Sequence, residues 1–259
     1  MKSVEPQTLL ADLEQTRKNR QALFCRPNLL YWYQKLYERI LGDDRESVAA
    51  MRILEVGSGM SPLKYFYPSV ISSDVMPLEH LDLIFDAHRI DRLTEVADAS
   101  LDMIILTNVL HHLQRPLDFL AAATGKLQID GRIVLVEPYF SSLSRIVYGL
   151  FHHEPADFQI SSPCLSEIKG PLSSANQALP YLIFHCRQQW RQQVEENYRI
   201  DPVGSFHYTA LSYMMTGGVS RELKIPHWIY RCLWRYDAWL ARFFPRQLAA
   251  FFVVVLVKR

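Results

Sequence analysis

The chain has 259 residues, 49% of them hydrophobic and 21% charged, which suits one or two folded domains and argues against intrinsic disorder. Its formal net charge of +1 disfavours a protein that binds nucleic acid in bulk, because such proteins are usually strongly basic. The four cysteines form no CxxC pair, so they support neither a zinc ribbon nor a dense disulfide framework and are expected to be reduced thiols.

Two features of the sequence bear on its location. The first residues lack the apolar run of a signal peptide. The longest apolar stretch, Leu248 to Val257, has ten residues, whereas a membrane-spanning helix needs about 20. We therefore expect a soluble, cytoplasmic protein, with association at a membrane surface left open.

The first 50 residues are expected to form a helical cap. Apolar residues between Leu29 and Leu41 recur at helical spacing, and Gly42 ends the pattern. From Arg52 onward the pattern changes to short, often continuous apolar runs, which are typical of strands buried on both faces of a parallel sheet. These runs are Ile53–Val56, Val70–Ile71, Leu81–Phe85, Met103–Leu106 and Ile133–Val136. A helical pattern at Leu117–Leu127 lies among them, so we predict a doubly wound α/β sheet.

Residues 51–138 are expected to form the core of a single domain, which two further segments complete. Residues 139–207 carry several prolines and are long for a connection, which predicts an inserted lid that shapes a binding pocket. Residues 208–259 are expected to contain three elements: a strand near Leu211–Thr216, a helix from about Pro226 to Phe244 and a final strand at Phe251–Val257.

The most informative stretch is Ile53–Pro62, in which a buried strand runs into Gly57-Ser58-Gly59. Glycine lets the backbone turn sharply and approach a ligand closely, because it has no Cβ. Asp74 ends the next strand 17 residues after Gly57, where α/β nucleotide sites place the carboxylate that binds ribose hydroxyls. The alternative is structural, because the glycines could serve only a tight turn and Asp74 could cap a helix.

Two kinds of nucleoside cofactor could use this loop. A dinucleotide needs a third glycine, so that its pyrophosphate can approach the N-terminus of the next helix, but Pro62 stands at that position. Glu55 lies two residues before the first glycine and would repel phosphates. A cofactor that has an amino group and no phosphate therefore suits the loop better.

Several segments together resemble the motifs of the class I S-adenosylmethionine-dependent methyltransferases, of the type 11-like kind that acts on small molecules. These segments are Glu55–Gly59, Asp74, Asp86-Ala87, Ser100–Leu113 and Leu127–Pro138. The resemblance implies a Rossmann-like, mostly parallel seven-stranded sheet with an antiparallel last strand, and S-adenosylmethionine as the cofactor. It implies ribose binding by Asp74 and adenine contact by Asp86 and Ala87. The full set of implied cofactor-binding residues is Glu55, Gly57, Ser58, Gly59, Asp74, Val75, Asp86, Ala87 and Asn108. Ser61 departs from the family, which often has a third glycine there.

The resemblance also implies the reaction, a direct displacement of the methyl group by an oxygen, nitrogen or carbon of the acceptor. Positioning supplies much of the acceleration in such a reaction. Asn108-Val-Leu replaces the Asn/Asp-Pro-Pro-Tyr/Phe pattern of methyltransferases that act on nucleic-acid amino groups, so we expect a small molecule, sugar or lipid as the acceptor. His153 and Glu154, in the predicted lid, are the candidate catalytic residues. Asn108 is expected either to line the pocket or to cap the following helix.

Two functions of other classes compete with this one. The chain could be a non-catalytic module that only binds the cofactor, or a metal-dependent hydrolase that uses the pairs His111-His112 and His152-His153. Adjacent histidines point in different directions, and neither HxxxH nor HxH occurs, so we predict no metal site. For His111 and His112 a structural role is the expected one.

The segment 226–246 has an unusual composition, because a broad apolar face alternates with Arg231, Arg235, Arg242 and Arg246. Residues 221–259 contain eight Lys or Arg and two acids, which gives this segment a net charge of +6. The rest of the chain carries −5. This helix could pack on the sheet with its arginines in solvent. It could also contact a membrane surface or an anionic, hydrophobic substrate.

Overall fold

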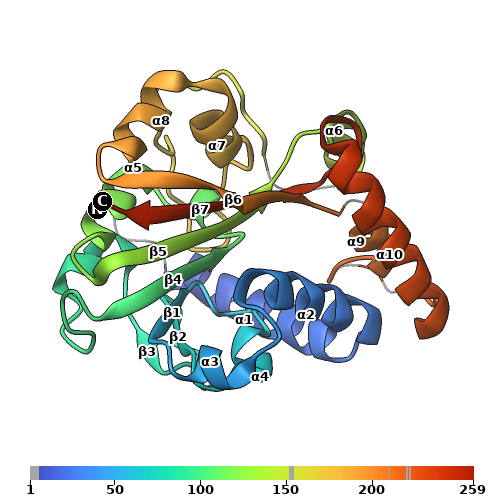
Figure 1. Ribbon diagram of the computed structural model, residues 1–259, viewed down its shortest axis with the longest axis horizontal. Helices are drawn as coiled ribbons and strands as arrows, with labels where there is room; N and C mark the ends of the chain where they lie inside the picture. Colours follow the sequence, from blue (N-terminus) through green and yellow to red (C-terminus); the bar gives the residue numbers. More distant parts are fainter. Residues whose placement is uncertain (1–5, 152–154, 210, 220, 222) are drawn as a thin grey trace.

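The computed structural model describes residues 6–151, 155–209, 211–219, 221 and 223–259. Within these residues, seven strands form one sheet in the order β3-β2-β1-β4-β5-β7-β6 (Figure 1). β1 to β5 pair in parallel, and β7 runs antiparallel to both of its neighbours, β5 and β6. The strands are β1 (Ile53–Val56), β2 (Ile71–Asp74), β3 (Leu83–Ile84), β4 (Leu101–Thr107), β5 (Leu127–Pro138), β6 (Tyr198–Tyr208) and β7 (Phe251–Lys258). The predicted mostly parallel, seven-stranded sheet with an antiparallel last strand is confirmed.

Helices cover both faces of this sheet and also lie beyond the carboxyl ends of its parallel strands (Figure 1). The predicted helical start of the chain is confirmed by three helices, α1 (Pro6–Phe24), α2 (Pro27–Leu41) and α3 (Arg45–Ala49). The others are α4 (Leu63–Phe66), η1 (Ala87–Arg92), η2 (Leu110–His112), α5 (Pro116–Ala123), α6 (Ser142–Phe151), α7 (Ala178–Tyr181), the π-helical η3 (Leu182–Cys186), α8 (Gln188–Glu195), α9 (Leu211–Thr216), α10 (His227–Phe243) and α11 (Pro245–Leu248).

Successive residues of the central strands belong to two different hydrophobic cores. Ile104 and Leu106 of β4 join residues of α5, α7 and α8 in one core. Met103 and Ile105 of the same strand join residues of α2 and α4 in the other. Both sides of the strand are therefore apolar, which explains the continuous rather than alternating apolar runs in the sequence.

One prediction in the second half of the chain was wrong. The segment Leu211–Thr216 is the helix α9 and not a strand, because the Ser212 N–H is bound by Asp237 on α10, at 2.7 Å, a partner that is remote in sequence. The lid predicted for residues 139–207 stays a prediction. These residues include most of the edge strand β6, and the helices α7 and α8 among them contribute to a core of the sheet. β6 tolerates Pro202 and Gly204 because its pairing with β7 shifts register between Asp201 and Phe206.

One edge of the sheet collects the carboxyl ends of the parallel strands. α6 follows β5 directly, and α11 precedes β7, whose amino end lies beside the carboxyl end of β5. α6 and α11 pack against each other, and Figure 1 shows α6, α9 and α10 grouped at this end of the molecule. None of the helices in the described ranges has the length and apolar character needed to cross a bilayer.

Candidate cofactor site at the carboxyl edge

The glycine loop after β1 is held between the ends of two other strands. The N–H groups of Gly57 and Ser58 donate to the carbonyl oxygen of Ser73 on β2, at 2.9 and 2.8 Å. Gly57 has φ +79°, and a Cβ at this position would lie 2.3 Å from Cγ2 of Val109, in the turn after β4. Glycine is therefore required here both by the left-handed backbone and by the close approach of the β4 turn.

Asp74, at the end of β2, also binds the glycine loop. Its Oδ2 accepts the N–H of Gly59 at 2.9 Å, and its Oδ1 accepts the N–H of Met76 at 3.0 Å. The side chain is buried, and this burial raises the pKa of the carboxyl group. Each carboxylate oxygen can accept two hydrogen bonds, so Asp74 keeps acceptor capacity for ligand hydroxyls. Val75 follows it with an exposed side chain.

Asn108 lies at the carboxyl end of β4 in a strained conformation. Its φ is +56°, a left-handed value that asparagine tolerates better than most residues, and its N–H donates to the carbonyl oxygen of Val136 at 2.8 Å. Its Oδ1 is buried and accepts no hydrogen bond from the described residues. The residue at the start of η2 is Val109, so Asn108 does not cap that helix. A buried acceptor without a donor costs about 1–3 kcal/mol, which a ligand donor would offset.

Asp86 and Ala87 lie just beyond β3, where the sequence places them. Asp86 caps η1, because its Oδ1 accepts the N–H of His88 at 3.0 Å and contacts the Nδ1 of the same histidine at 2.9 Å. The hydrogen bond from His88 lowers the pKa of Asp86. This arrangement gives Asp86 a structural role, and contact with adenine stays a prediction.

Glu55 is buried beneath the glycine loop, with 1% of its surface exposed. One carboxylate oxygen accepts the Ser58 hydroxyl at 2.7 Å, and the other, Oε1, has no hydrogen-bond partner among the described residues. Burial raises the pKa of this carboxyl group to about 7, although the hydroxyl groups of Ser61 and Ser58 act to lower it. Near pH 7 the carboxyl group therefore populates both its protonated and its ionised form. A cation beside it would favour the ionised form.

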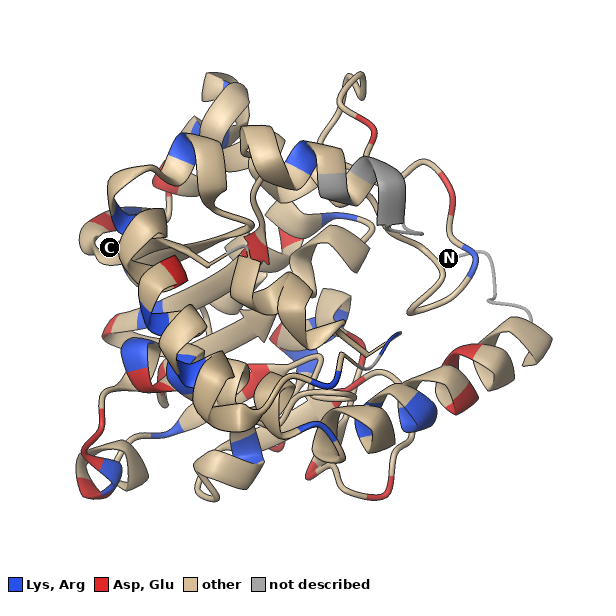
Figure 2. Cartoon of the chain, turned by 90° about the vertical axis from the view of Figure 1, so that its right-hand side faces the viewer, with Lys and Arg blue, Asp and Glu red and all other residues tan. Residues whose placement is uncertain are grey.

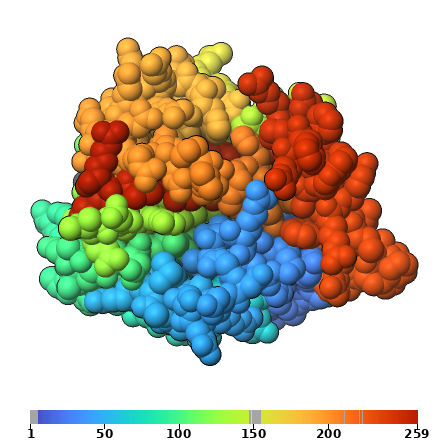
Figure 3. Space-filling view, in the orientation of Figure 1, coloured from blue at the N-terminus to red at the C-terminus, as the bar shows by residue number. Residues whose placement is uncertain are grey.

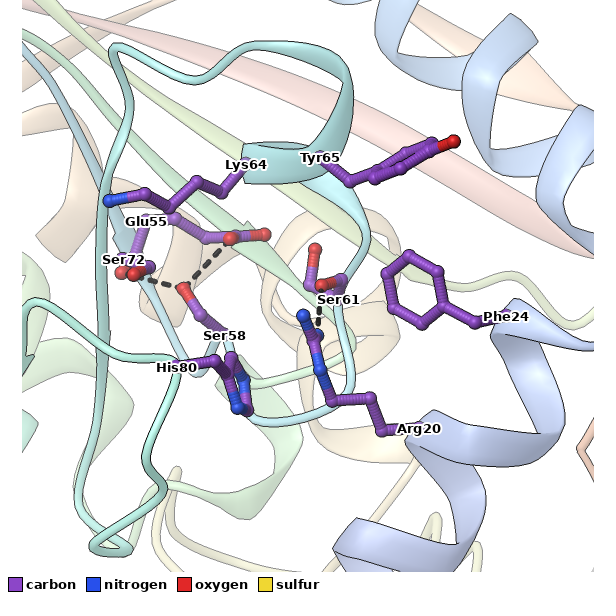
Figure 4. Close-up of a pocket in the computed structure, with 9 residues that line it drawn as sticks. All are labelled: Arg20, Phe24, Glu55, Ser58, Ser61, Lys64, Tyr65, Ser72 and His80. Carbon is purple, nitrogen blue, oxygen red and sulfur yellow. Dashed lines mark hydrogen bonds between the residues drawn. The ribbon is translucent and has the colours of Figure 1, made fainter.

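A cavity of about 230 Å³ opens beside Glu55 (Figure 4). Arg20 of α1 reaches into it, donates to the carbonyl oxygen of Ser61 at 2.8 Å and lies 4.7 Å from the centre of the Phe24 ring. The cavity thus has an acid on one wall and a cation on another, which suits a small zwitterion such as an amino-acid group. The lining residues are Arg20, Phe24, Glu55, Ser58, Ser61, Lys64, Tyr65, Ser72 and His80.

The sequence did not predict that α1 contributes side chains to this site. The Thr16 methyl carbon would lie 3.0 Å from a Cβ at Gly59, so the helix packs directly on the glycine loop. Asp12 anchors the same helix to the segment before α7, because its Oδ2 accepts the N–H groups of Leu172 and Ser173 at 3.0 and 3.1 Å. The helical pattern was visible, but no sequence signal says which of its residues meet partners more than 40 positions away.

The two histidines after β4, His111 and His112, make contacts that hold neighbouring segments of the fold together. Glu137, at the end of β5, accepts the N–H of Leu110 at 2.7 Å and contacts His111 Nδ1 at 2.6 Å, and both side chains are buried. His112 Nδ1 lies 2.8 Å from the carbonyl oxygen of Ser174. These contacts match the structural role expected for the pair. The candidate catalytic residues His153 and Glu154 lie outside the described residues. Within the described ranges, no three His, Cys, Asp or Glu residues are grouped as a metal site would need.

The pKa of Glu55 gives a prediction about stability. Since its carboxyl group has a pKa of about 7 in the folded chain against an ordinary value of 4.5, the folded state binds more protons than the unfolded state between these values. Stability from this group is therefore present below pH 4.5 and lost as the pH rises to about 7, by roughly 3 kcal/mol. Urea unfolding of the wild type and Glu55→Gln, compared at several pH values, should show this difference. A difference between the two proteins that does not change with pH would contradict the raised pKa.

The likenesses found between this chain and known proteins are to solved structures only. No family model and no curated protein matches the chain. Among solved structures, a SAM-dependent methyltransferase from Archaeoglobus fulgidus shares 14% identity at a TM-score of 0.45, over 87% of this chain and 100% of its own. The N-methyltransferase NodS from Bradyrhizobium japonicum, solved with S-adenosyl-L-homocysteine, shares 11% identity at 0.45, over 91% and 90%. A possible histamine N-methyltransferase from Thermotoga maritima shares 11% at 0.45, over 92% and 99%. At these identities and TM-scores the likeness carries no argument about what the chain does, so function must be argued from the site.

Proposed function

We propose that the chain binds S-adenosylmethionine at the carboxyl edge of the sheet and transfers its methyl group to a small-molecule or lipid acceptor. The observation that carries this proposal is the chemistry of the site, which offers three hydrogen-bond acceptors and, in the adjoining cavity, the cation Arg20. Asp74, the unpartnered Oδ1 of Asn108 and the unpartnered Oε1 of Glu55 are all acceptors. The cofactor is complementary, because its ribose hydroxyls and ammonium group donate, its sulfonium is cationic and it has no phosphate.

The residues of the chain fit this ligand in separate ways. Asp74 would accept from the ribose, and Val75 and Ala87 would pack beside the base. Glu55 and Arg20 would hold the ammonium and carboxylate groups of the methionine part in the cavity of Figure 4. Gly57 would let the ligand lie close to the loop. When bound, the cofactor supplies an electrophilic methyl group, and the protein contributes its orientation toward the acceptor and the exclusion of water.

Aromatic side chains of the core lie at the end of β5, on the side of the sheet where the proposed acceptor would enter. Tyr139 and Phe140, which follow this strand, each lie 5.5 Å from the ring of Tyr181 on α7, and Phe140 lies 4.9 Å from Phe158. Such a cluster suits a small or lipid-like molecule better than a nucleic-acid backbone, which attracts basic side chains. A catalytic role for His153 or Glu154 stays a proposal, because displacement by a well-placed nucleophile does not require a base.

The first experiment tests the cofactor. Titration calorimetry should show binding of S-adenosylmethionine and S-adenosylhomocysteine and none of NAD. NAD is expected to fail because Pro62, which has no N–H, precedes a helix of only four residues, α4, and because Glu55 lies beneath the loop. Binding of NAD with no response to either sulfur compound would overturn the proposal.

A second measurement separates an enzyme from a binding module. Labelled S-adenosylmethionine, incubated with candidate acceptors that include amphiphiles, should yield labelled product. Binding of the cofactor without turnover of any acceptor would favour the non-catalytic module of the same fold.

A further inference from the structure

The helix α10 presents a row of exposed aromatic side chains that nothing in the described structure covers. We name the set Trp228, Tyr236, Trp239 and Phe243 the aromatic stripe. Trp228 is 71% exposed and Phe243 is 58% exposed. Within the stripe, the rings of Tyr236 and Trp239 stack at 6.2 Å, and those of Trp239 and Phe243 lie 5.2 Å apart. The helix is 17 residues long, so the stripe extends over its whole length.

The opposite face of α10 fixes the orientation of the stripe. Tyr230, Asp237 and Ala241 are buried. The Tyr230 hydroxyl donates to the carbonyl oxygen of Ser212 at 3.0 Å, and Asp237 accepts the Ser212 N–H. The apolar face predicted from the sequence is thus divided, with one part in the core and the aromatic stripe in solvent. An exposed apolar row of this kind on a well-anchored helix marks an interaction surface.

Arginines line one side of the stripe. Arg231, Arg235 and Arg242 are exposed on α10, and Arg246 is exposed on α11. No Asp or Glu among the described residues lies within ion-pair distance of these four. Figure 2 faces this side of the molecule and marks the basic residues in blue. Among the described residues, the exposed charge of this surface is therefore positive.

This surface lies at the carboxyl edge of the sheet, where the proposed cofactor site also lies. α11 packs on α6, whose Ile146 is also exposed, and α6 follows the carboxyl end of β5. Arg246 and Arg145 lie close enough to Tyr139 to lower the pKa of its phenol, although burial raises that pKa overall. In the space-filling view the segment that contains α10 projects at the right-hand side of the molecule (Figure 3). A flat partner could therefore contact the stripe without meeting the rest of the chain first.

We propose that α10 docks the chain on an anionic bilayer, with the aromatic stripe inserted at the interface and the four arginines on lipid headgroups. Tryptophan and tyrosine favour the boundary between hydrocarbon and headgroups, and an apolar helix face flanked by arginines is the pattern of interfacial helices. A second copy of the chain fits less well, because self-association would bring the same uncompensated arginines together. The docking places the carboxyl edge near the bilayer, so it would give an amphiphilic acceptor a route to the site, a consequence that rests on the proposed function.

The test is flotation with vesicles of phosphatidylcholine alone or with 30% phosphatidylglycerol, at low and high salt. Wild-type protein should float with the anionic vesicles at low salt and much less at high salt or with neutral vesicles. Each arginine near an anionic surface contributes about fivefold to binding, so Arg235→Glu with Arg242→Glu should weaken binding by at least about 25-fold. Trp239→Ala with Phe243→Ala should also weaken it.

Matched controls separate the surface from general effects. Arg92→Glu with Arg115→Glu changes the net charge equally, at exposed sites away from α10, and should keep most of the binding. Ile129→Ala with Val203→Ala removes exposed apolar side chains elsewhere and should keep it as well. No flotation of the wild type, equal loss in test and control variants, or self-association through α10 in sedimentation would each overturn the proposal. Since S-adenosylmethionine binding should be normal in all these variants, a negative result here leaves the cofactor proposal standing.

Discussion

Replacement of Gly57 by alanine should destabilise the fold by about 2–5 kcal/mol and abolish measurable cofactor binding. A left-handed conformation costs a residue with a Cβ roughly 1–2 kcal/mol. The new methyl group would also meet Val109 Cγ2 at 2.3 Å, and overpacking of this kind typically costs about 1–3 kcal/mol. Because the loop must move to relieve the clash, the approach of a ligand changes as well. Urea unfolding and calorimetry with S-adenosylhomocysteine measure the two effects.

Two variants make this prediction specific. Gly125→Ala places a Cβ 3.5 Å from the carbonyl oxygen of Ala122, an ordinary contact, so it should leave stability and binding nearly unchanged. Val109→Ala removes both methyl groups that cause the clash, so Gly57→Ala should cost less in that background than in the wild type. A Gly57→Ala protein with wild-type stability and binding would show that the loop is not packed as described.

The central strands could be predicted from the sequence because their signal is local. Met103–Leu106 is a continuous apolar run and Ile53–Val56 is interrupted only by Glu55, and each lies within a strand that both cores cover. The edge strand β6 gave the opposite signal, since Pro202 and Gly204 normally argue against a strand. It forms because it pairs only with β7 and shifts register around these residues. Information about pairing at an edge is not contained in the strand itself.

The same limit applies to the site. Gly57, Gly59 and Asp74 could be placed near one another because parallel strands end at one edge, and the contact between Gly59 and Asp74 confirms that placement. The positions of Thr16 and Arg20 in the site could not be predicted, because they depend on how α1 packs across the loop. The exposure of the aromatic stripe on α10 could not be predicted either. The sequence pattern of a helix with a broad apolar face is the same whether the protein core covers the whole face or only part of it.

Replacement of Asp74 by asparagine should weaken binding of S-adenosylmethionine at least about tenfold, and up to several hundredfold. Hydrogen bonds from ribose hydroxyls to a carboxylate contribute roughly 1.5–3 kcal/mol each, and the amide of asparagine offers one acceptor oxygen instead of two. Asparagine disturbs the loop less than alanine, because its one oxygen still accepts from either Gly59 or Met76. Asp74→Ala would leave the N–H groups of Gly59 and Met76 without acceptors in a buried place, which costs about 1–3 kcal/mol for each.

Ligand chemistry can show whether the loss arises at the ribose. A 2′,3′-dideoxy analogue of S-adenosylhomocysteine should bind the wild type more weakly than the parent compound, and the Asp74→Asn protein should discriminate between the two much less. Asp44→Asn is the matched control, because Asp44 caps α3 and asparagine caps helices equally well. If folded Asp74→Asn protein kept the wild-type affinity and the wild-type discrimination, Asp74 would serve only to fasten the glycine loop. The ribose would then have to be bound by other acceptors, of which the buried and unpartnered Oδ1 of Asn108 is the nearest in kind.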